Sequence, residues 1–382
     1  MKILLLASGT VRSSLTARII NIGRELIKQG HEVVLIAPSA DKYSDYKTQK
    51  VSTIDGIKVI YPVQLTSRSQ VLNFLPYVPA VAWRIWRQKA DIIHLYKPTP
   101  LTLVGLLAGI RVKTKVILDM DDLGSQVMVR EGNAKWKVWL VEKAEHLAGR
   151  YSDAIISASS YLRDYYSAKY PTKSVIWVPN GVRAYVPGLA KNGSPIVFIG
   201  SLNHLGILMP LIESLPTVVS GAESDSPMLH IIGDGSMRTE LMTKTIELGL
   251  QDEVRFSDGW VSVDELKHHV YAGSLGYICV PDDDTYKAAS SQKVFNYLSL
   301  GIVPVVNRVG DLPYYVEDGI SGYIVGQDLA STLINAIADI DDRAARVIAG
   351  RKYIEDNFLW SVLADQITDF YRSQLIGKVE SK

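Results

Sequence analysis

Short apolar runs alternate with longer amphipathic stretches along the chain. ILLLA (3–7) precedes a stretch with helical periodicity near 14–29, and HEVVLIAP (31–38) follows it. Similar β-rich runs occur at 58–62, 91–96, 115–120, 153–159 and 174–179. Strands separated by helix-length segments are typical of parallel βαβ units. The pattern predicts an α/β fold.

The same alternation begins again in the second half of the chain. PIVFIG (195–200) precedes a helical run, and further strands are predicted at 228–235, 254–259, 275–281 and 302–307. The intervening GVRAYVPGLAKNGSP (181–195) is rich in Gly and Pro, as linkers are. We therefore expect two doubly wound Rossmann-like domains facing across a cleft, at 1–187 and 188–358, and a final helix within 359–382.

Length and composition agree with a globular protein of two domains. The chain has 382 residues, of which 47% are hydrophobic and 21% charged. Its one cysteine, Cys279, excludes a disulfide framework and a cysteine-rich metal site. The opening apolar run is too short for a signal peptide, and 101–110 is too short to span a bilayer. We expect a cytoplasmic protein.

The net charge of +1 hides an asymmetry between the halves. Residues 1–187 contain 26 Lys and Arg against 14 Asp and Glu, whereas residues 188–382 contain 15 against 26. A basic first domain could face an anionic membrane or a phosphorylated acceptor. Alternatively, the opposed charges only help the halves approach each other.

Polar residues and glycines follow several predicted strands of the second domain. Gly200, Ser201 and Asn203 lie at the end of PIVFIG (195–200) and just after it, and Gly235 comes two residues after LHIIG (229–233). Bare backbone there can approach a phosphate or a base, although glycine after a strand is often plain turn chemistry. The sequence SSQKVFNYLSL (290–300) begins a predicted helix with Ser290, Ser291 and Lys293. Helix amides beside hydroxyls and an ammonium suit a diphosphate; the alternative is that one serine is merely an N-cap.

In these segments the chain resembles the GT-B glycosyltransferases, specifically the retaining family 4. The likeness covers nearly the whole chain and is carried by the order and spacing of several motifs. These are GRELIKQGHEVVLIAP (23–38), VPNGV (178–182), IVFIGSL (196–202), IIGDGSMRTEL (231–241), LGLQDEVRFSDGWVSVDEL (248–266), 290–325 and FLWSVLADQITDFYRSQL (358–375). The last matches a helix that in this family crosses back onto the first domain.

The resemblance implies transfer of a sugar from a nucleoside diphosphate sugar to an acceptor hydroxyl, with retained anomeric configuration. It places the base near Gly233, Gly235, Trp260 and Val261, and the phosphates at Ser290 and Ser291. The first domain would hold the acceptor. It implies no cofactor and no metal, because helix amides and cations neutralise the leaving diphosphate. The acidic run 282–284 is expected to form a solvated loop or to touch the donor sugar.

The chain departs from the family pattern at two places. Family members usually carry glutamates at the positions of Ala288 and Asn296; the second binds both ribose hydroxyls, and Asn296 keeps only an uncharged acceptor. Asn296 is expected to face the nucleotide sugar or, alternatively, to be an exposed helix residue. The usual arginine and lysine after the glycine at position 200 are also absent. Lys293 is the best replacement, followed by His204, Lys287 and Arg12.

The first domain has an acidic group at a predicted strand end. Asp119 and Asp121 are candidates to orient an acceptor or sugar hydroxyl, whereas Asp122 could instead cap a turn. The loop predicted after the first strand is where acceptor-binding loops are expected, and it contains Thr10, Arg12 and Ser13. His94, inside an apolar run, is expected to be a satisfied core residue.

Aromatic and basic residues are mixed at 71–89 and at 136–143. This combination suits a membrane interface, although the tryptophans could instead pack into the core. The partners expected are a nucleotide-sugar donor, a lipid-linked or saccharide acceptor and an anionic inner-membrane surface, where the protein would be peripheral. Nucleic acid is not expected, because the basic residues are dispersed.

The leading hypothesis is a glycosyltransferase of cell-surface polysaccharide or glycolipid assembly. One alternative is a catalytically silent relative that binds a nucleotide sugar or a partner protein, as the missing cations suggest. The other is a sugar-nucleotide epimerase on the same frame, which the segment 290–325 fits less well.

Overall fold

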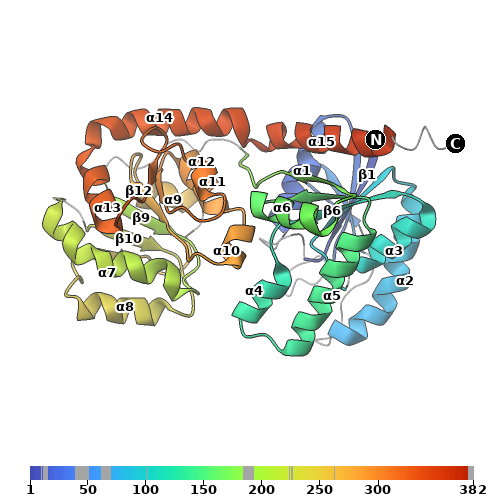
Figure 1. Ribbon diagram of the computed structural model, residues 1–382, viewed down its shortest axis with the longest axis horizontal. Coiled ribbons are helices and arrows are strands. Elements are labelled where there is room, and N and C mark those ends of the chain that lie inside the picture. Colours follow the sequence, from blue (N-terminus) through green and yellow to red (C-terminus); the bar gives the residue numbers. More distant parts are fainter. Residues whose placement is uncertain are drawn as a thin grey trace. The chain divides into compact units, whose positions relative to one another are not determined.

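The chain forms two compact α/β units. The computed structural model describes the chain apart from residues 10, 12–15, 39–50, 62–69, 101, 184–192, 223, 225–226, 262 and 377–382. The first unit comprises Met1–Asn180, Ala288–Ser290 and Trp360–Lys382, and the second comprises Gly181–Lys287 and Ser291–Leu359. The predicted boundary at 187/188 lies outside the described residues. Each unit has a sheet flanked by helices, as predicted (Figure 1).

The sheet of the first unit has eight strands in the order β3-β4-β2-β1-β5-β6-β7-β8. Its neighbouring strands are parallel except β3 and β4, which pair antiparallel; β3 was not predicted from the sequence. The strands are β1 (Lys2–Ala7), β2 (Glu32–Ile36), β3 (Val51–Ile54), β4 (Ile57–Ile60), β5 (Ile92–Tyr96), β6 (Lys115–Met120), β7 (Ala154–Ser157) and β8 (Ser174–Trp177).

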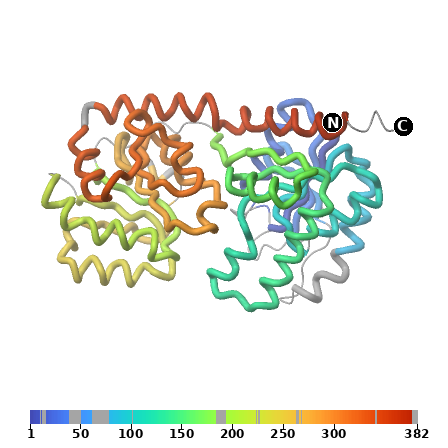
Figure 2. Tube along the Cα trace, in the orientation of Figure 1, coloured from blue at the N-terminus to red at the C-terminus, as the bar shows by residue number. Residues whose placement is uncertain are grey.

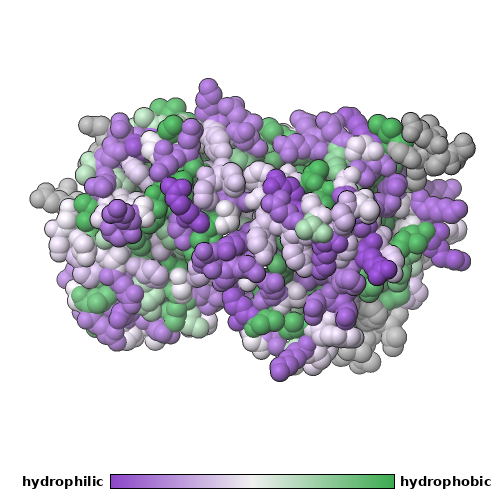
Figure 3. All heavy atoms as spheres, in the orientation of Figure 1, coloured by the Kyte–Doolittle hydropathy of each residue, from purple (hydrophilic) through white to green (hydrophobic). Residues whose placement is uncertain are grey.

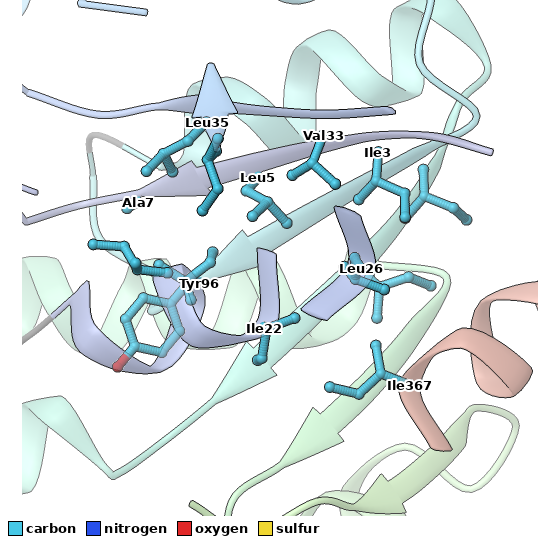
Figure 4. Close-up of a cluster of buried hydrophobic side chains, with 14 of the residues drawn as sticks. Ile3, Leu5, Ala7, Ile22, Leu26, Val33, Leu35, Tyr96 and Ile367 are labelled. Atoms are coloured by element: carbon cyan, nitrogen blue, oxygen red, sulfur yellow. The ribbon is translucent and has the colours of Figure 1, made fainter. Parts of the chain in front are cut away.

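Helices bury both faces of this sheet. Ile3 and Leu5 of β1 belong to one hydrophobic cluster, and Leu4 and Leu6 to another, because successive strand residues point to opposite faces. Figure 4 shows the first cluster, which α1 and α15 cover. Burial on both sides explains why the strands read as uninterrupted apolar runs. The helices of this unit are α1 (Ala17–Lys28), α2 (Gln70–Gln88), α3 (Leu103–Val112), α4 (Gly124–Arg130), α5 (Lys135–Tyr151), α6 (Ser160–Lys169) and α15 (Trp360–Ile376).

The helix α15 comes last in the sequence but belongs to the first unit. Trp360, Leu363, Ile367 and Tyr371 are almost completely buried in the same cluster as β1. In Figure 2 the red end of the tube accordingly lies beside the blue strands and helix of the N-terminus. The strand β1 and the helix α15, far apart in the sequence, therefore share one hydrophobic core.

The sheet of the second unit has six parallel strands in the order β11-β10-β9-β12-β13-β14. The strands are β9 (Ile196–Ile199), β10 (Leu229–Ile232), β11 (Val254–Phe256), β12 (Leu275–Ile278), β13 (Val303–Val306) and β14 (Tyr323–Ile324). The helices are α7 (Leu205–Gly221), α8 (Arg238–Glu247), α9 (Val263–His269), α10 (Asp284–Ala288), α11 (Gln292–Leu300), α12 (Leu312–Tyr315), α13 (Leu329–Ala338) and α14 (Ile340–Asn357).

Truncating Ile367 tests whether α15 stabilises the first unit. We expect Ile367→Ala to destabilise it by about 2–5 kcal/mol, because the substitution leaves a cavity in a closed core. Ile376 lies at the end of the same helix and is 67% exposed, so Ile376→Ala should change the free energy of unfolding by less than about 0.5 kcal/mol. Differential scanning calorimetry of both variants measures the difference, and equal losses would contradict the prediction.

Candidate active site

The side chain of Lys293 is turned inward at the start of α11. The helix begins after Ser291, whose side chain makes no capping hydrogen bond. The Lys293 ammonium lies over the ring of Phe198, with Nζ 5.2 Å from the ring centroid. A Cβ atom on Gly200 would come 2.4 Å from Cε of this lysine. The absence of a side chain at residue 200 therefore leaves room for the lysine at the end of β9.

The surroundings of Lys293 favour an anion. Burial lowers the pKa of its ammonium, and no carboxylate of the described residues lies within ion-pair distance of it. A partly buried cation without a counter-ion is costly unless a ligand supplies the opposite charge. The first amides of a helix add partial positive charge at the same place. The helix start can therefore hold a phosphate.

The loops after β9 and β10 pack backbone against backbone. Gly200 donates its N–H to Ile232 O at 2.9 Å, and Leu202 donates to Asp234 O at 2.9 Å. Gly233 has φ of 150°, and a Cβ atom there would come 1.9 Å from Gly200 O. These glycines therefore allow the close approach of the two loops, and they keep the strand ends next to Lys293 in a fixed arrangement.

Two other polar residues predicted to bind donor lie in the loop after β9. Asn203 Oδ1 accepts a hydrogen bond from Ser236 N at 2.9 Å, so this oxygen already holds the two loops together. A Cβ atom on Gly235 would come 2.6 Å from the same oxygen. Ser201 is half-buried beside them. The structure thus gives Asn203 and Gly235 a role in shaping the loops.

Arg238 is a functional candidate that the sequence analysis missed. Its Nη1 donates to Gly233 O at 3.0 Å and its Nη2 donates to Ser257 O at 2.6 Å. Both bonds go to uncharged carbonyls, so the guanidinium brings positive charge to the loop after β10. The sequence feature that could have pointed to Arg238 is its position three residues after Gly235, in the loop predicted to approach the donor. Of the two residues predicted to lie near the base, Trp260 is 66% exposed and Val261 is half-buried.

The two positions that depart from the family pattern have different surroundings. Ala288 is completely buried in the core of the first unit, where a glutamate side chain would not fit without loss of packing. Asn296 is exposed on α11, and its Oδ1 accepts a hydrogen bond from Gln292 Nε2 at 3.1 Å. Of the two expectations for Asn296, this placement agrees with that of an exposed helix residue.

Ser290 belongs to the first unit, whereas Ser291 belongs to the second. Ser290 Oγ accepts a hydrogen bond from Asn180 N at 2.9 Å, and its carbonyl accepts one from Asn180 Nδ2 at 3.1 Å. Both serines were predicted from the sequence to bind phosphate. In the structure Ser290 is hydrogen-bonded to Asn180, whereas Ser291 places its hydroxyl at the start of α11.

Asp119 is the centre of a buried network. Arg18 Nε donates to its Oδ2 at 2.9 Å, and His94 Nε2 donates to the same oxygen at 3.1 Å. The carboxylate can only accept, so Nε2 is the donor; in a neutral imidazole Nδ1 then accepts from the Tyr371 hydroxyl. Burial alone would raise the pKa of Asp119, but Arg18 and His94 hold it below its usual value. The expectation that Asp119 orients a substrate hydroxyl does not fit a side chain with no exposed surface, whereas His94 is the core residue predicted.

Asp121 remains accessible at the carboxyl end of β6. Its side chain is 18% exposed, and it accepts hydrogen bonds from Tyr96 OH at 2.9 Å and Asn180 Nδ2 at 3.3 Å. Lys97 Nζ lies 3.4 Å from Asp121 and 2.6 Å from Asp122, so the neighbouring carboxylate is also paired. Asp121 is thus a held carboxylate that still reaches solvent.

Three predicted acceptor-side residues, Thr10, Arg12 and Ser13, lie outside the described residues.

The acidic run 282–284 makes hydrogen bonds and an ion pair with residues close to it in the sequence. Asp283 accepts hydrogen bonds from the amides of Thr285 and Tyr286 at the start of α10, and Asp282 pairs with Lys287 at 2.7 Å. Lys287 is therefore already neutralised, which leaves Lys293 as the stronger candidate for the missing cation.

Within the described segments, no three carboxylate, histidine or cysteine side chains come together as a metal site would require. The described helices likewise lack the length and hydropathy of a bilayer-crossing segment.

Comparison with protein families identifies both units. A model described as a glycosyl transferase 4-like domain matches residues 15–181, and one described as glycosyl transferases group 1 matches residues 193–342. The chain belongs to the GT-B glycosyltransferases of family 4 type. The family resemblance predicted from the sequence is confirmed.

Curated relatives of this glycosyltransferase are mycobacterial. The GDP-mannose-dependent alpha-(1-6)-phosphatidylinositol monomannoside mannosyltransferase of Mycobacterium tuberculosis is 25% identical over 244 residues, 59% of this chain and 63% of that protein. The match thus spans less than two thirds of that relative. The protein of the same name from Mycolicibacterium smegmatis is 23% identical over 94% of this chain and 93% of its own.

Solved structures show the same fold. Anabaena Alr3699/HepE in complex with UDP and glucose superposes with a TM-score of 0.71 at 17% identity, covering 98% of this chain and 100% of that chain. Sucrose-phosphate synthase from Thermosynechococcus elongatus superposes with a TM-score of 0.71 at 16% identity, covering 98% and 99%. At these identities the likeness extends to the fold alone.

Breaking the buried Arg18–Asp119 pair should destabilise the first unit. We expect Asp119→Asn to lose about 3–5 kcal/mol, since Arg18 remains buried without its counter-charge. Asp122→Asn, which breaks a partly exposed pair, should lose no more than about 1 kcal/mol. Because the folded pKa of Asp119 is lowered, its contribution is present above the unfolded carboxyl pKa of about 4 and disappears as pH falls through the folded value. Thermal melts of both variants at neutral and acidic pH test this; an Asp119→Asn melt as high as that of Asp122→Asn would refute it.

Proposed function

We propose that the protein transfers a sugar from a nucleoside diphosphate sugar to an acceptor hydroxyl, with retention of configuration, during glycolipid or polysaccharide assembly. The bond between the anomeric carbon and the diphosphate breaks, and a bond to the acceptor oxygen forms. The acceptor loses its proton, and the nucleoside diphosphate leaves. The negative charge that develops on the leaving group is what the enzyme must stabilise.

The observation that carries this proposal is the buried ammonium of Lys293 at the start of α11, which has no ion-pair partner among the residues that the structure describes. It supplies the positive charge that other family members place after the glycine at position 200, a loop that here contains no Arg or Lys between 201 and 206. The Ser291 hydroxyl and the helix amides add donors for the second phosphate. With the charge supplied by the protein, we propose that transfer needs no divalent metal and no cofactor.

The donor and acceptor are proposed from the relatives. GDP-mannose is the first donor to test, because the mycobacterial relatives are named for it, and UDP-glucose is the second, because it was bound to Alr3699/HepE. A lipid-linked or saccharide acceptor follows from the phosphatidylinositol monomannoside in the name of the same relatives. Asp121 is the carboxylate that we propose orients a hydroxyl.

We also propose that the first unit contacts an anionic membrane surface from the cytoplasmic side. Trp83 and Trp86 of α2 are 46% and 63% exposed, and Trp136 and Trp139 of α5 are 58% and 54% exposed. Cations accompany them: the guanidinium of Arg87 lies 4.9 Å from the Trp83 ring centroid. Exposed tryptophans beside basic side chains are typical of a headgroup interface.

One observation favours a catalytically silent alternative. Ala288 is buried where family members carry a glutamate, so the carboxylate expected at this position is missing. A silent protein would bind the nucleoside diphosphate without turning over its sugar. Turnover of GDP-mannose or UDP-glucose with a membrane lipid extract separates the two.

Lys293→Met tests the proposed role of the ammonium. We expect kcat to fall by about 10²–10³-fold, as when a single electrostatic contact to a developing anion is removed, and nucleoside diphosphate affinity to fall as well. Lys352→Met, which removes an exposed lysine of the same unit, should leave both values unchanged. Radiolabelled sugar transfer and calorimetry measure the two effects; unchanged affinity in Lys293→Met would exclude this lysine as a phosphate ligand.

The binding of a nucleoside diphosphate should also depend on pH. Burial lowers the pKa of Lys293, so the free protein loses this positive charge as pH rises through the lowered value. A bound diphosphate favours the ammonium and should raise its pKa again. We therefore expect affinity to weaken with rising pH and binding to take up protons, as calorimetry in buffers of different ionisation enthalpy can measure. Lys293→Met should abolish the proton uptake.

A further inference from the structure

A cavity lies in the first unit, at the end of the sheet opposite Asp121. It has a volume of about 1000 Å³ and lies between the carboxyl-terminal ends of α2 and α3. Residues that precede β5 and β6, among them Asp91 and Thr114, form part of its lining. Asp121 follows the carboxyl end of β6, whereas this cavity lies at the amino end of the same strand. It is therefore separate from the candidate acceptor site.

The lining of the cavity is strongly basic. Arg87, Lys89, Arg111 and Lys113 contribute four cations against the single carboxylate of Asp91. That carboxylate already accepts a hydrogen bond from Lys2 N at 2.7 Å. Within the described segments, no carboxylate lies at ion-pair distance from Arg87, Lys89 or Arg111. The cavity thus has a surplus of positive charge that an anion would neutralise.

The rest of the lining is apolar, and the rim continues into exposed hydrophobic side chains. Ile85, Ile93 and Leu375 form part of the wall. Trp86 at the rim is 63% exposed, and Leu107 and Ile110 on the outer face of α3 are 67% and 51% exposed. Figure 3 shows hydrophobic side chains over α3 among hydrophilic ones. The combination fits an amphiphile better than a free anion.

Helix-end electrostatics accounts for only part of this arrangement. Cations stabilise the carboxyl ends of helices, which explains a basic residue after α2 and after α3. Both ends use a lysine in the left-handed conformation, Lys89 with φ of 48° and Lys113 with φ of 57°, at a cost that glycine avoids. The dipole explains neither the hollow between the helices nor its apolar wall.

We propose that this cavity binds the phosphate headgroup of an anionic membrane lipid, while Trp86, Leu107 and Ile110 enter the interface around it. The inference rests on the membrane contact proposed above and specifies which surface makes it. It does not depend on the sugar or on the role of Lys293. A specific headgroup site of this kind would hold the first unit in one orientation on the membrane.

Vesicle binding of the full chain tests the proposal. The probes are vesicles of phosphatidylcholine, vesicles of phosphatidylcholine with phosphatidylglycerol, and inorganic phosphate. Of the two kinds of vesicle, we expect the protein to bind only those with phosphatidylglycerol. We expect this affinity to fall about tenfold or more in Lys89→Gln/Arg111→Gln, because each basic residue near such a surface contributes measurably. Lys58→Gln/Lys352→Gln removes the same net charge from exposed positions elsewhere and is the matched control.

The outcomes separate the two proposals. If the wild-type protein does not bind vesicles with phosphatidylglycerol, both the proposed membrane contact and the proposed headgroup site are refuted. If both double variants weaken binding equally, contact occurs through diffuse charge and the headgroup site is wrong. Saturable binding of inorganic phosphate that competes with vesicles supports the site, whereas phosphate binding without vesicle binding overturns it. Emission of Trp86, isolated by comparison with Trp86→Phe, should shift to the blue only with the anionic vesicles.

Discussion

The buried ion pair between Arg18 and Asp119 joins the parts of the first unit that the candidate site depends on. Its guanidinium also donates to Val178 O at 2.8 Å, to Pro179 O at 3.0 Å and to Asn180 Oδ1 at 3.3 Å. Asn180 in turn holds Asp121 and Ser290. A charge pair with no access to water is costly unless each of its donors and acceptors is used. Here that requirement fixes the segment that positions the accessible carboxylate.

The same pair shows why sequence patterns predicted the sheets better than the site. Strands that are buried on both faces have continuous apolar sequences, so nearly every strand could be located from the sequence. The partners Arg18 and Asp119 are 101 residues apart, and nothing near Asp119 in the sequence indicates that its charge is already neutralised. The short β3 was missed because its residues alternate between half-buried and exposed, which gives a weak signal.

More of the candidate phosphate site could be predicted from the sequence, because its groups are close together along the chain. Lys293, Ser291 and the helix start are contiguous, and the glycines mark the places where the β9 and β10 loops approach each other. The contact of Asn203 with the amide of Ser236 could not be predicted from the sequence, since the two residues are 33 positions apart. Asn296 shows the same limit: helical periodicity places it on α11, but only packing reveals that this face is exposed. Local motifs predict which groups are present, and tertiary contacts decide which of them are available.

Placing α15 in the first unit has a consequence for the order of folding. During synthesis the residues of the second unit emerge before Trp360, Ile367 and Tyr371, which complete the core around β1. Domains usually fold in the order in which they leave the ribosome. Here the second unit can fold first, while one apolar face of the amino-terminal sheet is covered by α1 alone and His94 lacks its tyrosine partner. A nascent chain of this protein is therefore most exposed to aggregation just before its last helix appears.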